Sequence, residues 1–167
     1  MYIVTVKNNL SRRELAMNSG YNNILIYNHK TGTTVSLNAD QENKYALTMT
    51  ATEVQEKNKR FEKAVFTPSE QKKKLAGYAC AASKVRYSNG EEATFYYTGD
   101  LIPPNESFNT MLPGLQGIPL EYEVKSSAKT TIRFEATALE TKSIDLINFD
   151  IPKDYKIVTK QELEKIK

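Results

Sequence analysis

The sequence has few of the residues that metal sites need. Its 167 residues include one cysteine, one histidine and no tryptophan. With Cys80 as the lone cysteine, no disulfide can form within the chain. His29 and Cys80 would still need two carboxylates to complete a zinc tetrad, and no paired spacing suggests such a set. The sequence therefore predicts no metal site and no cofactor.

The scarcity of histidine also limits nucleophilic catalysis. No G-x-S-x-G motif is present, and a lone histidine restricts serine and cysteine mechanisms alike. Cys80 stands among alanines, which favours a small buried strand residue over a reactive thiolate. His29 lies near Gly32 in a hairpin turn and is interpreted as a solvated turn residue. Because no spacing favours a carboxylate pair either, we expect no catalytic residue and no enzyme.

The chain also lacks an excess of one charge and any long apolar run. Its 23 basic and 20 acidic residues give a net charge of +3, too small to imply a nucleic-acid partner. The aromatic run Phe95 to Tyr97 lacks the glycine-rich context of RNA-binding strands. No stretch approaches the roughly 18 apolar residues of a membrane-spanning helix. We therefore expect neither a nucleic-acid partner nor a transmembrane segment.

What the sequence does have is a series of short strand patterns joined by turn residues. Ten tyrosines and many threonines and valines suit half-buried strands. The predicted strands are 2–7, 12–17, 23–27, 33–37, 44–50, 80–87, 92–98, 119–125 and 130–139. The clearest hairpin joins 80–87 to 92–98 through Ser88-Asn89-Gly90, and a second one turns through Ser126 to Ala128.

A few segments depart from the strand pattern. Capping boxes at Thr50–Glu53 and Thr159–Glu162 predict a helix from about residue 51 to 61 and a short C-terminal helix. Pro68 is expected to stop any element that follows that first helix. Residues 99–117 form a proline-containing loop long enough to suggest a functional role. The apolar segment 146–152 is expected to dock against the sheet.

These elements predict a single domain over residues 1–167. The fold class is mainly β, of the α+β kind, with one large curved antiparallel sheet that is open or partly closed. No βαβ spacing appears, so we expect no parallel sheet. Such a sheet either packs a solid core or encloses a cavity for an apolar ligand, and both alternatives stay open at this stage.

Four segments in the second half resemble a family of bacterial cell-envelope proteins of unknown function, many of them predicted lipoproteins. They are Lys74–Cys80 (KLAGYAC), Tyr96–Thr98 (YYT), Gly114–Tyr122 (GLQGIPLEY) and Phe149–Tyr155 (FDIPKDY). Within the last segment, Asp154 stands where the family usually has glycine. The match covers about residues 70 to 160, and the family is in turn distantly similar to the LolA-like and LolB-like lipoprotein carriers.

The resemblance implies a LolA-like half-barrel with short helices on its concave side. It also implies an exported, periplasmic or outer-membrane-associated protein whose leader is absent from this chain. The family offers no catalytic residues to transfer, and Ala81 and Ala82 depart from the lysine-rich stretch that commonly follows its cysteine. Because a fold does not fix a function, the carrier activity of the distant relatives is an expectation only.

Two functional hypotheses follow. The first is an envelope binding protein that holds a lipid or another hydrophobic ligand on the concave face, with loop 99–117 as its rim or lid. Alternation along the strands gives the candidate lining residues Leu47, Met49, Phe95, Tyr97, Tyr122 and Phe134. The second is a non-enzymatic structural or interaction protein with a solid core, which docks an envelope protein through exposed strands or the 99–117 loop.

Overall fold

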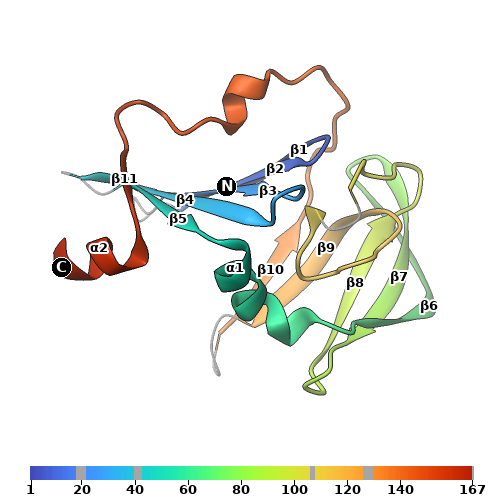
Figure 1. Cartoon of the computed structure of the whole chain (residues 1–167). Helices are drawn as coiled ribbons and strands as arrows, with labels where there is room; N and C mark the ends of the chain where they lie inside the picture. The colour runs from blue at the N-terminus through green and yellow to red at the C-terminus, as the bar shows by residue number, and fades with distance from the viewer. Residues whose placement is uncertain (18–21, 40–42, 106–107, 126–129, 167) are drawn as a thin grey trace. The chain divides into compact units, whose positions relative to one another are not determined.

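The mainly antiparallel β fold predicted from the sequence is confirmed. A computed structural model describes residues 1–17, 22–39, 43–105, 108–125 and 130–166 (Figure 1). The chain forms two compact units, of which unit 1 comprises Met1–Lys57 and Ser143–Lys167 and unit 2 comprises Asn58–Lys142. The strands belong to two sheets, one in each unit, where the sequence predicted one large sheet.

Unit 1 contains a sheet in the order β1-β2-β3-β4-β5-β11. Its strands are β1 (Tyr2–Lys7), β2 (Leu10–Ala16), β3 (Asn22–Asn28), β4 (Thr33–Ala39), β5 (Lys44–Met49) and β11 (Lys156–Val158). The first five strands form consecutive antiparallel pairs. The short β11 comes from near the end of the chain and pairs with β5 in parallel at the edge of an otherwise antiparallel sheet.

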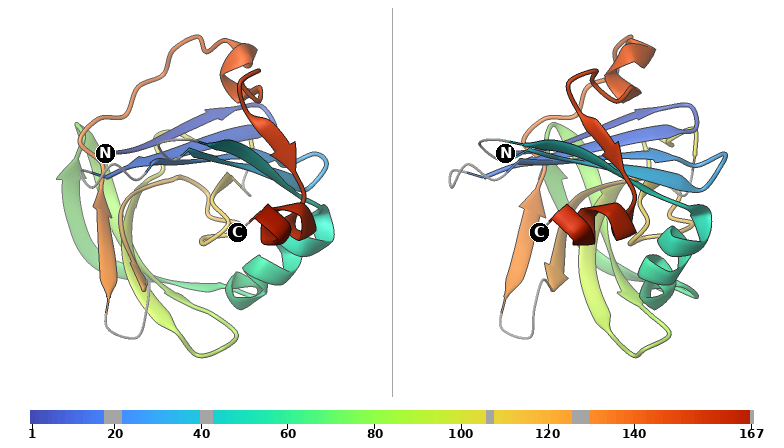
Figure 2. Two further views of the ribbon diagram at one scale, coloured as in Figure 1. Left: turned by 90° about the vertical axis from the view of Figure 1, so that its left-hand side faces the viewer. Right: turned by 60° about the vertical axis from the view of Figure 1, so that its left-hand side comes forward.

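The core of unit 1 lies on one face of this sheet. Alternation places Ile26, Leu37 and Ala46 on the same face of β3, β4 and β5, where they pack against Phe149. Phe149 comes from the 3-10 helix η3 (Leu146–Phe149), which lies over that face (Figure 2). The segment 146–152 thus docks as predicted through Phe149, while its other large apolar side chains at the start of η3 stay exposed.

Both capping boxes predicted from the sequence are confirmed, and both belong to unit 1. Before α1 (Ala51–Asn58), the Glu53 carboxylate accepts from the Thr50 backbone N–H at 2.8 Å, and the Thr50 hydroxyl accepts from the Glu53 N–H at 3.4 Å. The same reciprocal bonds join Thr159 and Glu162 at the start of α2 (Lys160–Ile166). Both helices lie on the face of the sheet opposite η3 (Figure 2).

Unit 2 contains a sheet in the order β10-β9-β8-β7-β6. Its strands are β6 (Val65–Leu75), β7 (Tyr78–Arg86), β8 (Glu92–Thr98), β9 (Ile118–Lys125) and β10 (Thr131–Glu135). All neighbours are antiparallel. The β7–β8 hairpin turns through Gly90 at a φ of 82°, as predicted, whereas the predicted turn at 126–128 lies outside the described residues.

The sequence did not predict most of β6, because Pro68 was expected to stop any element that follows the first helix. Pro68 instead pairs with Ser83 inside the strand. Since β6 is an edge of its sheet, proline can occupy it without removing a hydrogen bond from the ladder. The pairing shifts register between Ser69 and Lys72, and this bulge sets which of the following lysines faces which side.

The aromatic side of the unit 2 sheet is a filled core. It joins Phe61, Val85, Tyr87, Phe95, Leu112 and Leu115. Phe61 belongs to the 3-10 helix η1 (Lys59–Phe61), which completes the predicted first helix. The two leucines come from loop 99–117, which is therefore part of this core.

Two contacts fix the loop 99–117 in place. The Tyr87 hydroxyl donates to the Met111 carbonyl at 2.6 Å, while burial raises the pKa of Tyr87 to about 12. At the other end, Gly117 lies against β8 so closely that a Cβ atom would come within 2.4 Å of the Thr98 carbonyl oxygen. The start of β9 can approach β8 in this way because residue 117 has no side chain.

Candidate functional site

The two faces of the unit 2 sheet differ in chemistry: one packs against the aromatic core, and the other has charged side chains next to a smaller apolar cluster around Cys80. On β8, Phe95 points into the filled core, so Thr94 and Tyr96 point to the opposite face. That opposite face is rich in ionisable side chains, and we call it the charged face. Its members are Lys73, Lys84, Arg86, Glu92, Thr94, Tyr96, Glu121, Glu123, Arg133 and Glu135.

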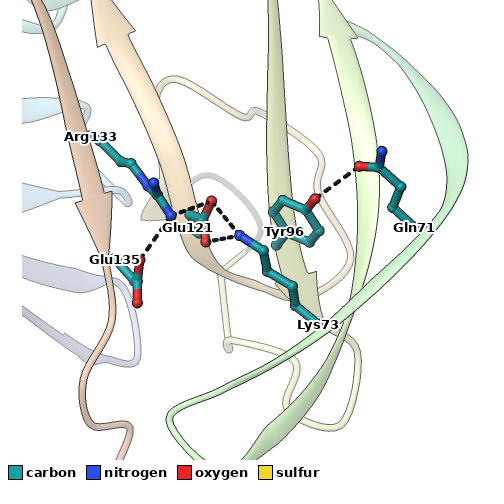
Figure 3. A network of polar contacts seen from close by, with 6 residues as sticks. All are labelled: Gln71, Lys73, Tyr96, Glu121, Arg133 and Glu135. Atoms are coloured by element: carbon teal, nitrogen blue, oxygen red, sulfur yellow. Dashed lines mark hydrogen bonds and ion pairs between the residues drawn. The ribbon is translucent and has the colours of Figure 1, made fainter.

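Glu121 of β9 is the centre of an ion-pair network on the charged face (Figure 3). Its carboxylate oxygens lie 2.8 and 2.6 Å from Nζ of Lys73. A guanidinium nitrogen of Arg133 lies 3.1 Å from the same carboxylate and 3.0 Å from that of Glu135. Glu121 is 9% exposed, so the two cations neutralise a charge that would be costly to bury alone.

Tyr96 extends the network toward the edge strand β6. The Lys73 ammonium lies 4.3 Å from the centre of the Tyr96 ring, a cation–π distance. The Tyr96 hydroxyl donates to the side-chain oxygen of Gln71 at 2.9 Å, on the residue next to the β6 bulge (Figure 3). The network therefore links all of β6, β8, β9 and β10 and holds its side chains in fixed positions.

The electrostatics keep Glu121 ionised. Burial raises the pKa of the Glu121 carboxyl, but the hydrogen bond and charge of Lys73, together with Arg133, outweigh burial and lower the pKa below its ordinary value of 4.5. A carboxylate held in this way is a weak base, whereas general acid–base catalysis is most efficient with a pKa near neutrality. The Glu121 carboxylate is therefore better suited to a structural role as a permanent negative charge than to proton transfer.

Next to the network, the charged face has an open hollow of about 340 Å³. Lys84 of β7 and Glu123 of β9 line it with Thr94 and Tyr96 of the intervening strand β8. At one side Arg86 and Glu92 are tied to each other, with 2.6 Å between Nε and the carboxylate. Within the described part of the chain, Lys84 and Glu123 make no ion pair, so the hollow offers one cation and one anion.

The six candidate lining residues lie in two different units. Leu47 and Met49 are on β5 of unit 1, with Met49 buried. Phe95, Tyr97 and Tyr122 belong to or pack against the filled core of unit 2, and Phe134 stacks on Tyr122 with 5.2 Å between ring centres. The four aromatic residues thus share one side of the unit 2 sheet, opposite the charged face.

The interpretation of His29 as a solvated residue is wrong. His29 does follow β3 in the turn before Gly32, but its ring is half-buried against Tyr27, with 4.3 Å between ring centres. Its Nε2 lies 3.0 Å from Oγ of Ser11. Burial, with a smaller effect from the charge of Arg13, lowers the pKa of His29 to about 4. Ser11 is 1% exposed, so a substrate cannot reach this serine–histidine pair.

Cys80 matches its sequence-based interpretation as a small buried strand residue. It lies on β7 with 2% exposure, packed with Leu75 and Leu120. Burial raises the pKa of its thiol, which makes the reactive thiolate rarer. Across the described ranges, no group of three or more metal-ligating side chains comes together, and no helix is long and apolar enough to cross a bilayer.

Sequence reasoning missed the charged face, although part of its signal was present. The predicted 80–87/92–98 hairpin already pairs Lys84 with Thr94 and Arg86 with Glu92, which places these side chains on one face. No pattern in the sequence indicated the Lys73–Glu121 contact. It joins residues 48 positions apart and depends on the β6 bulge.

Comparison with known proteins supports the fold and leaves the family open. No protein-family profile and no curated protein sequence matches the chain. A solved structure described as "Structure of PNGF-II in C2 space group" is similar in fold, with a TM-score of 0.53 and 17% sequence identity. The similarity covers 98% of this chain and 28% of that one, so the chain spans less than a third of the length of that protein. The envelope location and the lipoprotein-carrier resemblance stay predictions.

Proposed function

We propose that the chain is a non-catalytic interaction protein whose charged face docks a partner segment carrying both a carboxylate and a cation. The observation that carries this proposal is the hollow in which Lys84 and Glu123 have opposite charges and no ion pair among the described residues. A partner with matching charges would complete both pairs at once. Electrostatic matching of this kind gives specificity and a fast encounter.

The neighbouring network supports the proposal by pre-organising the site. Lys73, Glu121 and Arg133 are held by one another, so binding would immobilise few further side chains. The rim pair Arg86 and Glu92 is also largely exposed and can exchange partners. A charged surface whose central ion pairs are already formed, next to an open hollow, suits recognition of a protein segment.

The filled core of unit 2 favours this interaction protein over an apolar-ligand carrier. Phe95 is 1% exposed, and Leu112 and Leu115 of loop 99–117 pack onto the same side of the sheet. An apolar ligand there would have to displace the loop. The hollow that is open lies on the other face and is lined mainly by charged and hydroxyl side chains. A lipid cargo would find few apolar partners in it.

Synthetic peptides test the proposal directly. Immobilised peptides with one Glu and one Lys at varied spacing, and peptides with either charge alone, would be probed with the fluorescently labelled chain. We expect the two-charge peptides to bind best, and binding to weaken as salt is added. Lys84→Ala or Glu123→Ala should each lower affinity about tenfold, the effect of losing roughly 1.4 kcal/mol.

Matched controls come from the same unit. Lys59→Ala and Glu62→Ala remove an exposed cation and anion near η1 and should leave peptide affinity unchanged. Equal binding by Lys84→Ala, Glu123→Ala and the unchanged chain would rule out the hollow as the site. Separately, native mass spectrometry after incubation with envelope lipids should show a bare chain; a retained lipid mass would instead support the carrier hypothesis.

A further inference from the structure

In the described part of the chain the two sheets end in four edge strands, and β1 differs from the other three. A free strand edge invites pairing with another chain, so proteins usually protect it with charge, proline, a bulge or shortness. The edge β6 has Pro68 and a bulge, β10 has Arg133 and Glu135 in a strand of five residues, and β11 has three residues.

β1 has none of these devices along its first five residues. Residues 2 to 6 are Tyr-Ile-Val-Thr-Val, without charge or proline, and Lys7 stands at the end. The pairing with β2 runs without a register shift from Tyr2 to Lys7. Ile3 and Val4 are each 40% exposed. The edge is therefore regular, neutral and partly apolar, the combination that favours strand addition.

The hydrogen bonds of β1 show which backbone groups face outward. Met1 and Ala16 exchange both bonds, with the Met1 nitrogen donating at 2.7 Å and the Ala16 nitrogen donating at 2.9 Å. In an antiparallel pair such hydrogen-bonded pairs alternate with non-hydrogen-bonded ones. Ile3 and Thr5 therefore also bond to β2, whereas Val4 directs its N–H and C=O away from it.

We propose that β1 pairs antiparallel with β1 of a second copy of this chain, centred on Val4. In this register Val4 meets Val4 as a hydrogen-bonded pair, Ile3 meets Thr5, and Val6 meets Tyr2. Lys7 stands opposite Met1, whose ammonium already donates to the Ala16 carbonyl, so no two charged side chains face each other. The outward donors and acceptors of the two Val4 residues satisfy each other.

A second copy fits this edge because the residues that meet when the strand is reversed, Val4 with Val4, Ile3 with Thr5 and Tyr2 with Val6, are β-branched or aromatic and pack well across strands. Val4 has a β-branched residue on each side, and Tyr2 and Val6 flank these, so either strand can be reversed onto the other. A two-fold axis through Val4 closes after two copies, which makes a dimer and not a fibre. β1 belongs to unit 1 and the charged face to unit 2, so a dimer through β1 does not depend on the partner of the charged face.

Opposite charges at residue 4 provide the decisive experiment. The unchanged chain should sediment as a dimer in analytical ultracentrifugation, whereas Val4→Lys and Val4→Glu should each sediment as monomers, because like charges would meet at the axis. An equimolar mixture of the two variants should recover the dimer through Lys–Glu pairing. Misfolded variants would not recover on mixing. Val65→Lys, at a 61% exposed valine on edge strand β6, is the matched control and should stay dimeric.

Cross-linking supplies a second, independent measurement. The Cα atoms of a hydrogen-bonded antiparallel pair are about 5.5 Å apart, within the roughly 4.4–6.8 Å that a disulfide spans. In a Cys80→Ala background, Val4→Cys should form a linked dimer on mild oxidation and Val65→Cys should not. A monomeric unchanged chain at on the order of 1 mM would overturn the proposal, since only a very weak dimer dissociates there. A dimer that Val4→Lys leaves intact, or a mixture that stays monomeric, would overturn it equally.

Discussion

Lys73 of β6 reaches across β7 and β8 to Glu121 of β9, with Nζ within 2.8 Å of both carboxylate oxygens. The path is open because β7 presents small residues there: Lys73 pairs in register with Cys80, and Ala82 pairs with Tyr96. The Lys73 ammonium then lies over the face of the Tyr96 ring, in a cation–π contact. One side chain thereby ties together strands that do not pair directly.

Replacing that lysine should destabilise the fold measurably. Lys73→Met removes the ammonium and leaves Glu121, whose side chain is 12% exposed, with Arg133 alone. We expect the free energy of unfolding to fall by about 1–2 kcal/mol, the cost of a partly buried charge that loses a charged hydrogen bond. Urea denaturation measures this. Lys74→Met, at an exposed neighbour, is the control and should change stability little.

The pH dependence of stability should report the ionised state of Glu121. Its pKa is below 4.5 in the folded chain, so as pH falls the unfolded chain takes up this proton first. The contribution of Glu121 is present above about pH 5 and is lost as pH falls through the folded pKa. Glu121→Gln should therefore cost more stability at pH 7 than at pH 3.5. A difference that is constant between these pH values would contradict the ion-pair assignment.

The lone histidine allows a direct test of the buried turn. Proton NMR of the folded chain should show His29 titrating near its lowered pKa of about 4, and near 6.5 in urea. Because the folded pKa is the lower one, the unfolded chain binds the proton first as pH falls. Stability from neutral His29 is thus complete above about pH 6.5 and declines toward pH 4. A folded-state midpoint near 6.5 would show an exposed ring.

The capping box at α1 predicts a local loss of stability. Thr50→Ala removes the hydroxyl that accepts from the Glu53 N–H and should cost about 1 kcal/mol. Thr52→Ala, inside the helix, is the matched control; it should be neutral or slightly stabilising, since alanine has the higher helix propensity. Thermal denaturation of both variants distinguishes these results, and equal effects would mean that the cap contributes nothing.

The strands that the sequence predicted best are those with strict alternation and a strong turn. Glu92–Thr98 was predicted with its observed bounds because Asn89-Gly90 fixes the hairpin and Phe95 alternates with polar neighbours. The strand β6 was missed because proline is compatible with an edge position that local sequence does not reveal. The three-residue β11 depends on pairing with β5, a contact between distant segments.

The charged face was also hard to predict, because it too depends on contacts between segments that are distant in the sequence. Alternation shows that Phe95 and Tyr96 point to opposite faces, but it does not say which face is covered. The cover comes from Leu112 and Leu115 of loop 99–117, whose own sequence has no strand or helix period. The expected lining residues Tyr97 and Tyr122 were grouped by alternation, and the structure places both beside that filled core.

Cys80 and His29 give the chain one natural spectroscopic or chemical reporter in each unit. The buried thiol of Cys80 in unit 2 becomes available to a thiol reagent when that unit opens, and the ring signal of His29 follows unit 1. Recording both signals through one urea titration gives an unfolding curve for each unit without introducing any label. Equal midpoint urea concentrations would mean that the two units unfold in one cooperative transition. Different midpoints would mean that each unit unfolds independently.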